Sequence, residues 1–232
     1  MKKTVSILLT LCLLLACTSA ALADQTHRSP VYELYSADGW YEDDIGNSGI
    51  YSFHVPQIFD ASPDAEEINA EIAEQFGSRV EAHFGYMEKG TSFWSWKTDW
   101  EAYWSGNRLF LLVTSDLNGD DPDYAAYGYD FETGSRVTNE MILEQFGITE
   151  EEYLENLRET VRLMFEESYI PPPAGVKTNL DHDKLLENTL NRLDMEQPMF
   201  INQFGEITTI VIIDSIAGAG RYYALASPFS RQ

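Results

Sequence analysis

The order of the predicted elements indicates an α+β fold, a mostly antiparallel sheet with helices packed on it. Strand-like and helix-like stretches come in blocks rather than in strict alternation. A tight-turn sequence, Ser105-Gly106-Asn107, joins two strand-like runs directly, which is the connection of an antiparallel hairpin. Hydrophobic residues make up 44% of the 232 residues and aromatic residues 13%, so the chain can bury a core of domain size.

The first block consists of two strand patterns and one helix pattern. Tyr51, Phe53 and Val55 alternate onto one face of the second strand, and Pro56 indicates an edge or an end of that strand. Ser62-Pro63-Asp64 predicts a helix start, because it combines a capping serine with proline and an acid in the first turn. The expected elements are a strand over 30–37, a loop over 38–49, a strand over 50–58, and a helix through residue 80 that Gly77 ends or bends.

The central block carries an aromatic strand over residues 93–104 and, after the hairpin turn, an apolar strand at Leu109–Val113 that we expect to be covered on both faces. A third strand is expected over 124–131. Side chains alternate along a strand, so four tryptophans share a face that we expect to meet the core: Trp94, Trp96, Trp100 and Trp104. The opposite face is expected to meet solvent or a partner, and its candidate ligand-binding residues are Asp99, Glu101 and Tyr103.

The last block predicts helices followed by strands. Asn139 is expected to cap a short helix that Gly147 ends, and Thr149 with Glu152 predicts a capping box for a longer helix that stops before residues 171–173, three prolines. The remaining expected elements are a helix over 181–193, strands over 199–202, 207–215 and 222–226, and a glycine-rich bend at 217–220.

The first 23 residues predict a signal peptide. A lysine pair precedes an apolar run, and Ala21-Leu22-Ala23 offers a cleavage site before Asp24. A second interpretation remains open, because Leu14-Leu15-Ala16-Cys17 resembles a bacterial lipoprotein box in which Cys17 would carry a lipid. We therefore expect a secreted or cell-surface protein that meets a membrane only through that lipid.

The charge balance narrows the class of partner. The formal net charge is −23, and removing the leader with its two lysines makes it −25. Such a surface repels nucleic acid and attracts cations and basic proteins, although acidity also simply keeps an exported protein soluble. Both cysteines lie in the leader region, so we expect no disulfide and no thiolate chemistry in the rest of the chain.

Candidate chemical sites are few. Asp116, Asn118 and Asp120 have the spacing of oxygen ligands around calcium, and the alternative is a polar hairpin turn. We expect no cofactor unless this pattern binds calcium, which would make a calcium-stabilised structural domain. A carboxylate-dependent glycan hydrolase is a second alternative function, with candidate residues Asp99, Glu101, Asp116 and Asp130. We expect His54 to lie on a sheet and His83 on a helix surface.

A twelve-residue motif carries a family resemblance. Residues 127–138 read YGYDFETGSRVT, with a strand ending in Y-x-x-D-x-x-T-G-x-x-V-T before a short helix and a longer one. This pattern resembles a domain of unknown function in exported Gram-positive proteins. Residues 199–207 and 217–220 fit the closing hairpin of that family, and residues 51–76 look like its companion domain. Members form the extracellular part of the RsiV-type anti-sigma factor and precede the catalytic domain of PdaC-type peptidoglycan deacetylases.

The resemblance implies a non-catalytic, exported cell-envelope module for binding or sensing. It divides the chain after the leader into a strand–helix subdomain similar to the companion domain, 24–90, and an RsiV-like α+β domain, 91–232. The expected ligand is a cell-wall glycan or a basic protein such as lysozyme. No nucleic acid is expected to bind.

Overall fold

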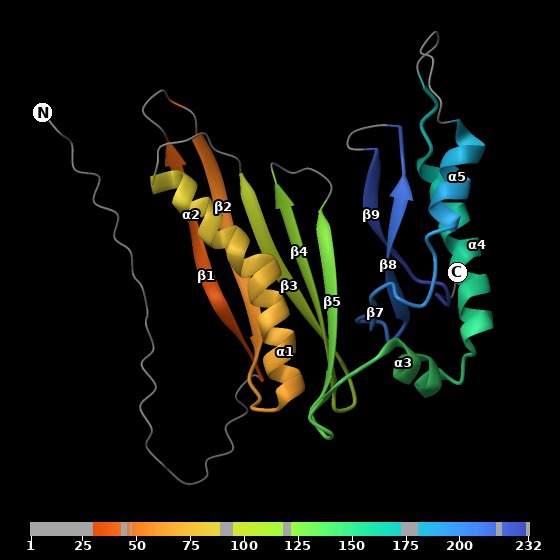
Figure 1. The fold of residues 1–232 in the computed structure, drawn as a ribbon, viewed down its shortest axis with the longest axis horizontal. Helices are drawn as coiled ribbons and strands as arrows, with labels where there is room; N and C mark the ends of the chain where they lie inside the picture. Colours follow the sequence, from red (N-terminus) through yellow and green to blue (C-terminus); the bar gives the residue numbers. More distant parts are fainter. Residues whose placement is uncertain are drawn as a thin grey trace, which may run out of the picture.

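The computed structural model describes residues 30–42, 46, 48–88, 95–117, 122–172, 181–216 and 220–230. They form an α+β fold, as predicted, in which helices pack on two sheets and not on one (Figure 1). The larger sheet has six strands in chain order: β1 (Val31–Glu42), β2 (Ser48–Ile58), β3 (Trp96–Ser105), β4 (Arg108–Leu117), β5 (Asp123–Asp130) and β6 (Ser135–Arg136). The smaller sheet has three: β7 (Met199–Ile201), β8 (Ile207–Asp214) and β9 (Arg221–Ala226).

The larger sheet is mostly antiparallel, as expected, and its exception is the pairing of β2 with β3. These strands run parallel and pair only from Tyr51–Trp96 to Phe53–Thr98. A helical segment connects them: α1 (Pro63–Ile72), a π-helical turn (Ala73–Gly77) and α2 (Ser78–Glu88). Strands from both sides of residues 90 and 91 thus share one sheet, and the domain division expected there stays a prediction.

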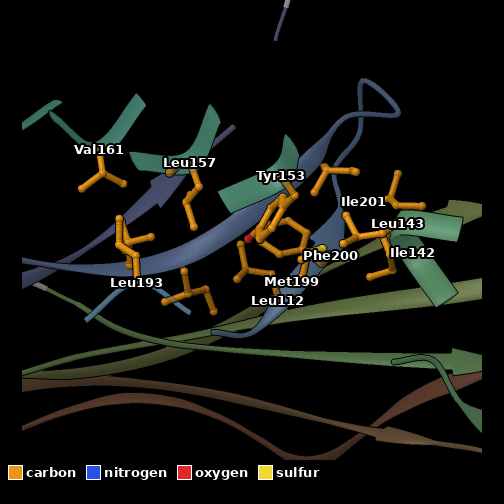
Figure 2. Packing of buried hydrophobic residues seen from close by; sticks show 14 of the residues in the cluster. Leu112, Ile142, Leu143, Tyr153, Leu157, Val161, Leu193, Met199, Phe200 and Ile201 are labelled. Carbon is orange, nitrogen blue, oxygen red and sulfur yellow. The ribbon is translucent and has the colours of Figure 1, made fainter. Parts of the chain in front are cut away.

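Strand β4 separates two hydrophobic cores. Leu109, Leu111 and Val113 belong to the first core, which α1 and α2 cover, whereas Phe110 and Leu112 belong to the second. The expectation that this strand is covered on both faces is confirmed. The second core lies between the larger sheet and three helices, α3 (Asn139–Phe146), α4 (Glu150–Ser168) and α5 (His182–Leu190), together with the smaller sheet. Figure 2 shows Tyr153, Leu157 and Val161 of α4 pointing into it.

The loop expected over residues 38–49 is wrong at both ends, because β1 continues to Glu42 and β2 begins at Ser48. Residues 43–45 and 47 lie outside the described residues. Gly39 pairs with Tyr51 of β2, and Tyr41 pairs with Gly49. A Cβ at either glycine would overlap the ring of the tyrosine opposite, so each ring covers the bare backbone across from it. The glycines and acids that indicate a loop in sequence are therefore accommodated in the strand.

Most helix starts agree with the sequence. The Ser62 hydroxyl caps α1 by accepting from the Ala65 N–H at 3.1 Å, and Thr149 caps α4 by accepting from the Glu152 N–H at 3.2 Å. Gly77 lies in the π-helical turn, and the helical segment continues beyond it. Thr138 and not Asn139 caps α3, since the Asn139 amide instead donates to the carbonyls of Met195 and Gln197.

Two of the three later helices end where the sequence predicts, and α5 ends earlier than expected. Gly147 ends α3 with a left-handed backbone at φ 66°. Helix α4 ends at Ser168, ahead of the prolines, and α5 ends at Leu190, three residues before the expected end at 193. No helix among the described residues has the length and apolar composition that a membrane crossing requires.

Candidate functional site

The best candidate for a functional surface is the side of β1, β2 and β3 that faces away from α1 and α2, which we call the open face. Phe53 and Val55 of β2 point into the first core, so Ser52 and His54, which alternate with them along the strand, point the other way, as do the residues paired with Ser52 and His54 on the neighbouring strands. Figure 1 shows β7–β9 and α3–α5 beyond β5, and β1 at the far side of the sheet. The open face consists of Ser36, Asp38, Trp40, Glu42, Ile50, Ser52, His54, Lys97, Asp99 and Glu101.

Strand register arranges these side chains in rows. Asp38, Ser52 and Lys97 are neighbours across β1, β2 and β3, and Asp116 of β4 continues the row. Three strand spacings make this polar row about 14 Å long. Trp40 and Ile50 are paired in the next row and are 69% and 65% exposed. Large apolar side chains are thus presented beside a charged row, a combination found in binding surfaces.

His54 lies in the middle of the β1–β2 part of the face, between two carboxylates. Its Nδ1 is 3.0 Å from Glu33 Oε1, and its Nε2 is 3.3 Å from Asp38 Oδ1. Partial burial alone lowers the pKa of His54, but the charges and hydrogen bonds of Glu33 and then Asp38 raise it above its ordinary value. The pKa of Asp38 is lowered, first by a hydrogen bond from Ser52 and then, against slight burial, by His54.

Two of the three predicted ligand-binding residues lie on the open face. Asp99 Oδ2 pairs with Lys97 Nζ at 3.1 Å, and Glu101 Oε2 accepts a hydrogen bond from the Tyr103 hydroxyl at 2.7 Å. The Tyr103 ring, by contrast, stacks on Phe200 of β7 with ring centres 5.7 Å apart, so it joins the second core and not the open surface. Burial, followed by the Glu101 hydrogen bond, raises the pKa of Tyr103.

The tryptophans of β3 follow the predicted face in part. Trp96 and Trp100 pack against the first core, as expected. Trp104 is 48% exposed and stacks on Phe131 with ring centres 5.8 Å apart, so its assignment to the core is wrong. Its position at the end of β3, beside the hairpin turn, explains this exposure. Trp94 lies outside the described residues.

The structure describes only part of the predicted calcium loop. Asp116 lies near the end of β4, whereas Asn118 and Asp120 lie outside the described residues. Within the described part of the chain, no group of three or more histidine, aspartate or glutamate side chains has an arrangement that could hold a metal ion. Calcium binding by this loop stays a prediction.

Asp130, one of the four hydrolase candidates, stabilises the turn within residues 127–138. It is 7% exposed, pairs with Arg108 Nε at 3.1 Å and accepts from the Glu132 and Thr133 N–H groups. Burial alone raises the pKa of Asp130, but these donors hold it below its ordinary value. A general acid needs the opposite shift, so this carboxylate stabilises the fold around Gly134, which turns the chain at φ 69°.

A groove of about 620 Å³ lies between the start of β1 and α1, away from the open face. Its lining is mainly apolar and includes Phe59, which is 63% exposed, and Tyr32. The Asn69 amide in its wall already bonds both backbone groups of Ile58, at 2.8 and 2.9 Å. The groove therefore has an apolar lining in which the Asn69 amide is already used within the fold.

Sequence reasoning missed two features of this region. Trp40 falls within the loop expected over 38–49, so the sequence does not predict its exposure on a strand. The signal for a strand here is the repeat of glycine and tyrosine two residues apart, Gly39-x-Tyr41 and Gly49-x-Tyr51, which face each other across the hairpin. His83 was expected on a helix surface and is 2% exposed, so that expectation is wrong. It packs among aromatic rings of three strands, a contact that helical periodicity does not reveal.

No family model matches the chain, and no curated protein matches it. A DUF3298 family protein from Pseudomonas aeruginosa PAO1 is a structural neighbour, with 9% sequence identity over 85% of this chain and 89% of that one. That neighbour belongs to a domain-of-unknown-function family, and the TM-score of 0.44 is too low to assign a common fold.

Proposed function

We propose that this protein is an exported, non-catalytic binding or sensing module of the cell envelope, and that it binds its ligand through the open face. The observation that carries the proposal is the pair Trp40 and Ile50, which expose large apolar surfaces beside the polar row of Asp38, Ser52 and Lys97. Exposed tryptophan next to hydrogen-bonding side chains suits both protein anchors and sugar rings.

The contacts of the carboxylates favour binding over hydrolysis. Asp38 is held by His54 and Ser52, Asp99 by Lys97, and Glu101 by Tyr103. A glycan hydrolase would need one carboxyl whose pKa is raised to act as an acid. The shifts of Asp38 and Asp130 go down, which stabilises the charged, hydrogen-bond-accepting form.

Of the two expected ligands, charge favours a basic protein such as lysozyme over a cell-wall glycan. Asp38, Glu42, Asp99 and Glu101 outnumber Lys97 on the open face, and the chain carries −23 overall. Such a field accelerates encounter with a cationic partner and is screened by salt. Export follows from the leader, through cleavage after Ala23 or a lipid on Cys17, and is part of the proposal.

Isothermal titration with lysozyme and with soluble peptidoglycan fragments tests this function. We expect at least one of them to bind, and Trp40→Ala to weaken binding by about tenfold, a typical loss for a central aromatic anchor. Trp104→Ala is the matched control, because Trp104 is also exposed but lies on the other face of β3. Equal losses in the two variants, or turnover of a wall glycan that Asp99→Asn abolishes, would contradict the proposal.

The same preparation tests the calcium alternative. A calcium-stabilised domain would unfold at a higher temperature in calcium than in chelator, because a ligand that binds only the folded state stabilises it. Under the proposed function the two unfolding temperatures are equal.

A further inference from the structure

The proposed function does not involve His83, a histidine of helix α2 whose side chain is buried against the larger sheet. Its side chain is 2% exposed, and its Nε2 atom is buried without a hydrogen-bond partner in the described part of the chain. A buried polar atom without a partner is rare in a folded protein and costs stability. Such an exception points to a role that a fully apolar residue could not fill.

Aromatic rings surround the imidazole. The ring centres of Tyr41, Tyr51, Phe53, Phe84 and Trp96 lie between 5.2 and 6.1 Å from that of His83. They come from β1, β2, β3 and α2 itself, so His83 is the point at which α2 touches the β1–β2 hairpin and β3 together. We call these residues the His83 cage.

Two charged side chains of α2 near the His83 cage pair with groups other than His83. On α2, Glu81 accepts from the Tyr35 hydroxyl of β1 at 2.9 Å, and Arg79 pairs with Asp123 of β5 at 3.0 Å. Among the described residues, the titratable groups whose rings contact the imidazole are the phenols of Tyr41 and Tyr51. Within the described residues, no carboxylate bonds to His83, whereas His54 and His182 each contact two.

We propose that His83 is an acid-sensitive latch: α2 stays docked on the β1–β2 hairpin while the imidazole is neutral, and protonation releases α2 from the sheet. A charged imidazolium would have to remain in an apolar cage without a counter-ion, and release lets water solvate it. Consistent with this geometry, burial lowers the pKa of His83.

The π-helical turn Ala73–Gly77 is suited to act as the hinge. It separates α2 from α1, which is held independently by Asn69 and by the Ser62 cap bonded to the Tyr129 hydroxyl at 2.7 Å. π-Helical turns interrupt the regular bonding of a helix and often mark functional sites. Release would therefore move α2 and leave α1 in place.

Hydrogen exchange resolved by residue tests the latch in the full chain. We expect the protection of the α2 amides, corrected for intrinsic rates, to fall between about pH 8 and about pH 5, while the α4 amides keep theirs. The fall should reach about tenfold for each unit by which the pKa of His83 lies below its ordinary value. Equal pH dependence in α2 and α4 would overturn the proposal.

Variants and a spectroscopic titration make the test specific. His83→Phe keeps an aromatic ring in the cage and should make α2 protection independent of pH, whereas His54→Asn should leave the α2 response unchanged. If His83→Phe does not fold, the NMR titration of the wild-type imidazole decides. The latch requires that the His83 signal titrate below that of His182, together with the loss of α2 protection. A His83 signal that titrates at or above that of His182 would overturn it.

Discussion

The two cores that meet at β4 cover their strands differently. Along β8 in the second core, seven of eight residues are buried, since the larger sheet lies on one side and helices on the other. Along β1 in the first part of the molecule, half-buried and exposed residues alternate after Val31. Only one face of β1 is covered by helices, and the other is the open face. Under the proposed function, the ligand binds where helices cover only one face of a strand.

The largest expected effects come from adjacent residues of β4 that serve different cores. Leu111→Ala and Leu112→Ala should each lower the free energy of unfolding by about 2–5 kcal/mol, because each leaves a cavity in a closed core. Urea denaturation measures both, and the double variant should be nearly additive since the side chains point apart. A cost for Leu112→Ala of less than about 1 kcal/mol would mean that the second core does not cover this face.

A somewhat smaller loss of free energy of unfolding is expected at the turn within residues 127–138. Asp130→Asn leaves Arg108 without its carboxylate and should cost about 3 kcal/mol, the lower end for a buried pair, because Arg108 keeps some solvent contact. The folded-state pKa of Asp130 is lowered, so the stability it adds is present above its unfolded value near 3.9 and is lost as pH falls through the folded value.

Denaturation of wild type and Asp130→Asn at neutral and at acid pH checks this sign. The difference between the two proteins should shrink below about pH 4. A difference that stays constant down to about pH 2 would show that the charge of Asp130 does not stabilise the turn.

A change of intermediate size in stability tests the β1–β2 hairpin, which carries seven of the ten residues of the open face. Gly39→Ala places a Cβ against the Tyr51 ring and should cost about 1–3 kcal/mol through overpacking. Gly85→Ala in α2 is the matched control: a Cβ there meets nothing within 4 Å, so the helix should gain up to about 1 kcal/mol. Thermal unfolding distinguishes the two, and equal effects would contradict the proposed packing of Tyr51.

The smallest expected change in the free energy of unfolding comes from substituting His54. Because its folded-state pKa is raised, its contribution is fully present below the unfolded value near 6.5 and is lost as pH rises through the folded value. His54→Gln should therefore cost up to about 1 kcal/mol near pH 5.5 and almost nothing near pH 9. Denaturation at both values measures this, and a cost that grows with pH would contradict the ion pairs with Glu33 and Asp38.

The sequence predicts β4, α3 and α4 well, because the signals for them lie within a few residues of each other. The Thr149–Glu152 cap, Gly147 and the apolar run Leu109–Val113 act over a few residues, so their sequence patterns suffice. The candidate site was predictable only in part. Asp99 and Glu101 follow from strand alternation, but the cover on Tyr103 comes from Phe200, nearly a hundred residues along the chain.

The wrong predictions for β1 and α2, the loop at 38–49 and the exposed His83, share a physical cause. Gly39 and Gly49 favour a loop by themselves, and only the tyrosines across the hairpin make them strand residues. His83 is polar, and only contacts with three other elements bury it. Long-range packing decided these positions, and single-sequence periodicity carries little information about such contacts.

The most direct measurement of the central claim is a map of backbone amide shifts as lysozyme or peptidoglycan fragments are added to isotope-labelled protein. If the open face binds, the largest changes occur at Asp38, Trp40, Ile50, Ser52 and Lys97, and the amides of α4 stay in place. Changes that gather on α4, α5 or β9 with β1 and β2 unmoved would contradict it.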